Sequence, residues 1–174
     1  MINIGQYIEM AINWMMVHFS TFFDAVNAGI GRFIIGFQHV LFGIPFYITI
    51  LVLAALAWMK AGRGTAIFTA LGLLLIYGMG FWEATMQTLA LVFSSTCLAL
   101  IVGVPLGVWT ANSPRAEKIL RPVLDLMQTM PAFVYLIPAV LFFGLGAVPG
   151  VFATIIFAMP PVVRLTGLGI RQVP

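Results

Sequence analysis

The stretch from Gln128 to Pro138 holds the side chains best suited to contact a passing solute. It reads QTMPAFVYLIP, and its hydroxyl, thioether and aromatic groups come from Thr129, Met130, Phe133 and Tyr135. The stretch is otherwise apolar enough to lie in lipid. We predict that these four side chains line a transport path. The alternative is that the two aromatic rings pack between helices or lie in a belt at the membrane interface.

Prolines interrupt this stretch and the apolar run that follows it. Pro131 and Pro138 lie in the first, and the adjacent Pro160 and Pro161 lie in the second. Each proline removes a backbone donor and clashes with the preceding helical turn. Inside a membrane such positions are tolerated where neighbouring helices or polar side chains satisfy the freed carbonyls, and broken helices in a bundle form transport paths. We therefore expect helix breaks at these four prolines.

Residues for catalysis, metal binding or nucleotide binding do not cluster anywhere in the sequence. His18, His39 and Cys97 lie far apart and lack metal-ligand spacing. No paired carboxylates and no Ser-His-Asp set fall at one depth, and no GxxxxGKS or GxxxxGKT phosphate loop is present. We therefore predict no catalytic residue, no metal and no cofactor, so any energy from ATP must come through a partner chain.

The composition is that of a membrane protein. Hydrophobic residues make up 62% of the 174 residues and charged residues 7%, and the mean hydropathy is +1.11. A soluble domain carries about 25% charged residues, so this chain has too few polar residues to cover the surface of a soluble fold. Its apolar runs approach the roughly 20 residues that a membrane helix needs, which predicts an all-α, polytopic transmembrane helix bundle surrounded by membrane lipids. The net charge of +3 is spread over short loops, so we predict no binding of nucleic acid.

The chain divides into three predicted regions, the last of which contains residues 128–138. Residues 1–43 carry polar positions seven apart and two carboxylates, Glu9 and Asp24, which predicts an amphipathic helix in the membrane interface; a spanning helix with a polar face is the alternative. Residues 44–82 contain two leading transmembrane helices, at about 44–59 and 65–79. Residues 83–174 contain three more spans, at about 84–110, 130–145 and 151–168, with a short polar helix that starts at Ser113 and Pro114. Small residues four apart on the first of these spans (Ala99, Gly103 and Gly107) predict a close helix contact.

Basic residues alternate between the ends of these spans. Lys60 and Arg63 lie in one turn, and the next turn holds Glu83 and no basic residue. Basic residues then return two spans later (Arg115, Lys118 and Arg121) and again two spans after that (Arg164 and Arg171). Because cytoplasmic loops carry an excess of lysine and arginine, we expect these turns to be cytoplasmic and the N-terminal segment to lie outside.

Four segments together resemble one family. They are QTMPAFVYLIP at 128–138, FGLGAVPG at 143–150, FAMPPVVRLT at 157–166 and GIRQVP at 169–174. They resemble the permease subunit of ABC importers for glycine betaine, proline betaine and related quaternary amines. The resemblance covers about residue 81 to the end and is most specific from Asp125 onward.

The resemblance implies a fold like that of type I ABC importer permeases, in the plasma (inner) membrane of a bacterium. It implies cytoplasmic ATPase subunits, a periplasmic or tethered substrate-binding protein, and a second permease subunit that we expect to be identical. Arg171 and Gln172 would then lie beside the ATPase. In such permeases a coupling loop would follow directly after Pro174, so we expect this chain to be a permease truncated at its C-terminus. A channel-like pore without an ATPase and a membrane-embedded lipid enzyme are the alternatives.

Overall fold

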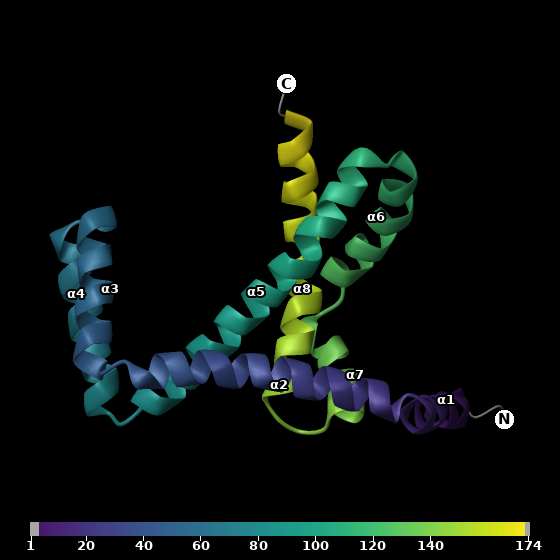
Figure 1. Cartoon of the computed structure of the whole chain (residues 1–174), viewed down its shortest axis with the longest axis horizontal. Helices are drawn as coiled ribbons and strands as arrows, with labels where there is room; N and C mark the ends of the chain where they lie inside the picture. The colour runs from purple at the N-terminus through teal and green to yellow at the C-terminus, as the bar shows by residue number, and fades with distance from the viewer. Residues whose placement is uncertain (1–3, 173–174) are drawn as a thin grey trace. The chain divides into compact units, whose positions relative to one another are not determined.

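The computed structural model describes residues 4–172, and all regular structure in that range is α-helical (Figure 1). The helices are α1 (Ile4–His18), α2 (Ser20–Gly43), α3 (Phe46–Ala61), α4 (Arg63–Gly78), α5 (Trp82–Asn112), α6 (Pro114–Thr129), α7 (Ala132–Phe143) and α8 (Ala147–Gln172). By length and composition, α2, α5 and α8 can each cross a membrane, and α6 with α7 forms one bent pair that also qualifies. The predicted all-α class is confirmed.

The helices fall into two compact units, which are described separately. One unit is Ile34–Val92, and the other joins the residues up to Phe33 with those from Phe93 onward. Helices α2 and α5 each contribute a part to both units. The candidate functional residues of the sequence all lie in the second of these units.

The unit Ile34–Val92 is built on the hairpin of α3 and α4, which lie side by side in Figure 1. Gly62 makes the turn between them with a φ of 92°, a conformation that L side chains rarely adopt. At the other end Phe46 stacks on Tyr77 with ring centroids 3.9 Å apart, and Trp82 meets both rings edge-on. Each helix has 16 residues, or about 24 Å, and both cover the predicted leading spans.

The second unit is organised around α8, which packs against α6 and α7. α5 crosses α8 at a close approach (Figure 1), where the glycines of α5 admit two side chains of α8. A Cβ built on Gly103 would lie 2.7 Å from Val162 Cγ1, and one built on Gly107 would lie 2.5 Å from Thr166 Cβ. The predicted contact through small residues is therefore confirmed, and Ala99 is buried one turn before Gly103.

The first half of α2 belongs to this unit and packs against α7. Phe23 of α2 stacks on Phe142 of α7 with ring centroids 4.6 Å apart, and the Asn27 amide donates to the Phe143 carbonyl at 3.4 Å. α2 ends at Gly43 and has the length of a membrane span. The two orientations predicted for residues 1–43, interfacial or spanning, both remain compatible with this helix.

Two of the predicted helix breaks are at odds with the structure of α8. This helix runs without interruption from Ala147 to Gln172 and includes Pro160 and Pro161, so the break predicted there is wrong. Pro138 likewise lies inside α7. A proline removes one backbone hydrogen bond but keeps a helical φ, and a helix held by its neighbours on both sides of that point does not have to end. Pro160 is fully buried in the packed part of α8.

Candidate functional site

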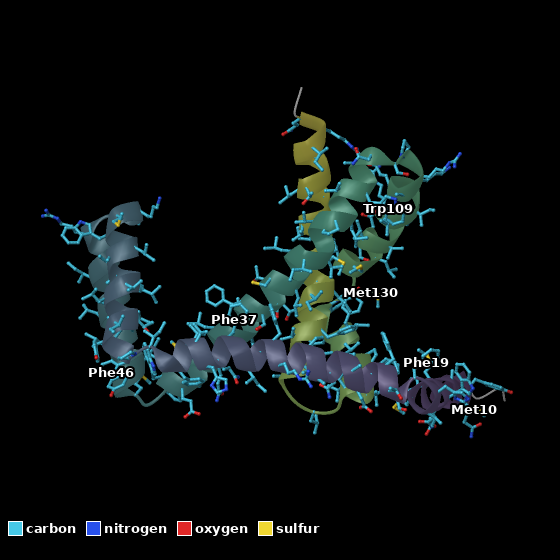
Figure 2. The ribbon with its side chains drawn as sticks, viewed as in Figure 1. Met10, Phe19, Phe37, Phe46, Trp109 and Met130 are labelled. Atoms are coloured by element: carbon cyan, nitrogen blue, oxygen red, sulfur yellow. The ribbon has the colours of Figure 1, made fainter. Side chains whose placement is uncertain are left out.

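The break between α6 and α7 is the sharpest feature of the chain at the predicted path. α6 ends at Thr129, Pro131 caps the start of α7, and the two helix axes differ in direction by 97°. Met130 adopts an extended conformation between them and is labelled at this bend in Figure 2. The predicted break at Pro131 is therefore present. Because α7 has only 12 residues, or about 18 Å, it is shorter than a membrane is thick.

The carbonyl of Leu126 holds the break together. It accepts from the Met130 backbone N–H at 3.3 Å, from the Thr129 hydroxyl at 3.1 Å and from the Tyr135 hydroxyl at 3.2 Å. A carbonyl oxygen has two lone pairs, so these donors share it. Tyr135 thereby ties the second turn of α7 to the last turn of α6, and two of the four predicted path residues are positioned by one acceptor.

The end of α6 presents partial negative charge beside an aromatic ring. The last carbonyls of a helix lack intrahelical donors and carry the negative end of the helix dipole, about half an elementary charge. Pro131 cannot donate to the Met127 carbonyl, because it has no N–H. Phe133, in the first turn of α7, is 77% exposed. Carbonyls at the end of one helix and an exposed ring at the start of the next suit a cationic group that lacks hydrogen-bond donors, since such a group is attracted to both by charge.

A second polar site lies where α8 ends against α5 and α6. The Arg171 guanidinium donates to both carboxylate oxygens of Glu117, at 3.1 and 2.7 Å, and to the Thr110 carbonyl at 3.1 Å. Two turns earlier on α8, Arg164 forms an ion pair with Asp125. These two pairs, which we call the ionic ladder, join α8 to α6 in antiparallel order. A groove of about 420 Å³ runs along the ladder, and the Arg121 side chain also lines it.

The ladder explains the electrostatics of this end of the molecule. Glu117 lies in the polar first turn of α6, ahead of the apolar part of the bent pair. The hydrogen bond from Arg171 lowers the pKa of the Glu117 carboxyl, and the charges of Arg171 and Arg121 act in the same direction. The Glu117 carboxylate therefore stays ionised to a lower pH than an isolated glutamate would, and the pair is present at neutral pH.

Residues predicted from the sequence to be functional occur in both of these sites. Thr129, Met130, Phe133 and Tyr135 do come together around one bend. Arg171 was predicted at the cytoplasmic end, and the exposed Gln172 follows it at the end of α8. The carboxylates of the ladder were missed. A signal was present, because Glu117 and Asp125 are eight positions apart on α6 and the two arginines are seven apart on α8, which is two helical turns in each case.

Comparison with known proteins places these sites in a family. Residues 103–174 match the family described as the binding-protein-dependent transport system inner membrane component. Over 173 residues, 99% of this chain, the sequence is 47% identical to the glycine betaine transport system permease protein OpuAB of Bacillus subtilis. The chain is therefore similar to membrane permeases of this kind. The matched region takes in the end of α5 and all of α6, α7 and α8, and so contains both the bend and the ladder.

Two further relatives of this chain have similar names. It is 47% identical over its whole length to the glycine betaine/proline betaine transport system permease protein ProW of Escherichia coli. It is 48% identical over 99% of its length to the glycine betaine/carnitine transport permease protein GbuB of Listeria monocytogenes. The chain spans 61%, 49% and 62% of the lengths of these three relatives, in the order given.

Proposed function

We propose that this permease forms the translocation path for glycine betaine and proline betaine-type osmolytes in a binding-protein-dependent ABC importer. The observation that carries the proposal is the identity of 47% over 99% of the chain to a permease named for glycine betaine transport. A separate ATPase subunit drives transport and a substrate-binding protein delivers the solute. The permease itself is a transport subunit and not an enzyme.

The bend between α6 and α7 is the part of the path that fits such a solute. A quaternary ammonium group has no N–H to donate and is attracted to an aromatic face by about 0.5–2 kcal/mol. Phe133 offers an exposed face, and the α6 carbonyl end adds partial negative charge nearby. Met130 supplies a flexible thioether that adapts to the shape of the solute. The Tyr135 hydroxyl joins α7 to the last turn of α6, and the Thr129 hydroxyl donates to the same Leu126 carbonyl within α6.

The remaining partners and the orientation follow from the same proposal. The turn with Lys60 and Arg63 and the ladder end with Arg171 and Gln172 lie on the cytoplasmic side, where the ATPase subunits dock. The N-terminal segment lies outside, in a bacterial plasma (inner) membrane. A second, identical permease subunit completes the path. Residues 1–43 form the interfacial segment, 44–82 the two leading helices, and 83–174 the start of the permease core.

The test is uptake by the full chain, co-expressed with its ATPase and binding protein in cells that lack other betaine importers. We expect Phe133→Ala to raise the KM for radiolabelled glycine betaine by about two- to thirtyfold, which is the range of one cation–π contact. Phe68→Ala is the matched control, because Phe68 is 78% exposed but lies on α4. Uptake that persists when the ATPase is inactivated would indicate a channel and overturn the proposal.

A further inference from the structure

The hairpin of α3 and α4 carries an apolar groove of about 500 Å³. Four alanines line it, two from each helix: Ala54 and Ala55 from α3, and Ala66 and Ala70 from α4. Larger side chains flank it along both helices, with Phe46 and Tyr47 near the start of α3 and Trp58 near its end. Small residues opposite one another leave a furrow between two helices that are otherwise bulky, so the groove follows the hairpin lengthwise.

Two cations stand at one end of this groove. Lys60 is in the last turn of α3 and Arg63 opens α4. The Arg63 guanidinium carbon lies 5.8 Å from the centre of the Trp58 ring, and Trp58 itself lines the groove. Within residues 4–172 the ion pairs are those of Arg164 and Arg171, so neither Lys60 nor Arg63 is neutralised by a carboxylate there. The groove therefore has an apolar body and a positively charged mouth.

The groove is too small to enclose a whole helix. A helix about 10 Å wide and 24 Å long, the length of this hairpin, fills on the order of 1,900 Å³. The groove offers about 500 Å³, which a single unbranched hydrocarbon chain fits. The two cations at the end of the groove also disfavour the binding of a wholly apolar side chain from another helix.

We infer that the groove binds one anionic phospholipid, with an acyl chain along the four alanines and the headgroup phosphate between Lys60 and Arg63. Each 16-residue helix is about 24 Å long, and a bilayer's hydrocarbon layer is about 30 Å thick. The turn therefore lies at a depth where phosphates must be drawn inward to meet it, and the two cations supply that attraction. The site requires only that the hairpin lies in a membrane and does not depend on which solute is transported.

The test uses the full chain in detergent with phosphatidylglycerol that carries a photoactivatable group in one acyl chain. After illumination, labelled peptides are mapped by mass spectrometry. We expect labelling to concentrate on peptides that contain Ala54, Ala55, Ala66 or Ala70. Ala55→Phe fills the groove from an exposed position and should lower this labelling at least about fivefold. Leu56→Phe is the matched control, because Leu56 is half exposed on the same helix and does not line the groove.

The charged mouth is tested by Lys60→Gln/Arg63→Gln, which changes two exposed side chains at the turn and leaves the apolar packing of the hairpin alone. Competition by unlabelled lipid reports the headgroup preference. We expect the wild type to prefer phosphatidylglycerol over phosphatidylcholine by about tenfold, and the double variant to lose that preference. Labelling spread evenly over exposed residues of α3 and α4, or unaffected by Ala55→Phe, would overturn the inference. A disulfide between two copies through Ala55→Cys, in a background of Cys97→Ala, would also overturn it, because a second copy would then occupy the groove.

Discussion

Replacing Gly107 with alanine tests whether the crossing of α5 and α8 depends on the absence of a side chain. The added Cβ would lie 2.5 Å from Thr166 Cβ, 2.9 Å from Thr166 Cγ2 and 2.9 Å from the Val163 carbonyl oxygen. Carbon atoms rest at about 3.5–4.0 Å from one another, so the two helices must separate by at least about 1 Å here. Neither close partner can move by a simple rotation of a side chain, since one is a Cβ and another is backbone.

The cost follows from that geometry. Overpacking that shifts backbone costs about 1–3 kcal/mol, and separating the helices also loosens the contact at Gly103, where Val162 Cγ1 would be only 2.7 Å from a Cβ. We therefore expect Gly107→Ala to lower the free energy of unfolding by about 2–3 kcal/mol. Reversible unfolding by sodium dodecyl sulfate in mixed micelles, followed by far-ultraviolet circular dichroism, measures it.

Two further variants make the result specific. Gly169→Ala is a matched control on α8, where a Cβ would meet nothing within 4 Å, and it should leave stability unchanged or raise it by up to about 1 kcal/mol, because alanine favours a helix more than glycine does. Thr166→Gly removes the atom that the new Cβ strikes and should recover part of the loss in a double-mutant cycle. If Gly107→Ala is as stable as Gly169→Ala, the close crossing does not exist as described.

Three other outcomes are expected. Glu117→Gln should remove the acid sensitivity of the ladder. Because Arg171 lowers the pKa of Glu117, the pair stabilises the fold at neutral pH, and this stabilisation is lost as the pH falls through the folded pKa of the carboxyl. The unfolding midpoints of wild type and variant should therefore differ at pH 7 and converge at low pH. Ser113→Ala should cost about 0.5–1 kcal/mol, since the Ser113 hydroxyl accepts from the Ala116 N–H at 3.3 Å at the start of α6, whereas Ser113→Asp should be neutral; equal stabilities of the alanine and aspartate variants would contradict the cap. Lys60→Cys and Arg121→Cys, each in a background of Cys97→Ala, should react with an impermeant maleimide only from the cytoplasmic side, and labelling of intact cells from outside would contradict the proposed orientation.

Local signals in the sequence predicted several contacts because a short rule governs each of them. Ser113 followed by Pro114 predicts a helix start, and the structure has Ser113 as N-cap and Pro114 at the first position of α6. Small residues four apart predict a close approach, which the glycines of α5 make with α8. Pro131 predicts a break, and the direction changes there by 97°. In each case the cause lies within a few residues of the effect.

Other features depended on neighbours that the sequence does not identify. Pro160 and Pro161 lie inside α8, because packing on both sides of them keeps the helix continuous. The same holds for Pro138 in α7. The ladder could be predicted only by knowing that α6 and α8 are antiparallel and in contact. That arrangement depends on how α7 reverses the direction of the chain. The sequence shows that Glu117 and Asp125 are charged, but it does not identify an ion-pair partner for either.

The two prolines in α8 also have a mechanical consequence. Without their N–H groups, the carbonyls of Ile156 and Phe157, four positions earlier, each lose the donor that a regular helix provides. Two neighbouring missing bonds make this the most compliant point of a 26-residue rod. Helix α7 packs on α8, the ladder joins α8 beyond the proline pair, and Gly103 of α5 lies against Met159 and Val162 on either side of that pair. We therefore expect any bending of α8 to be concentrated at the proline pair, at the point where α5 lies against it.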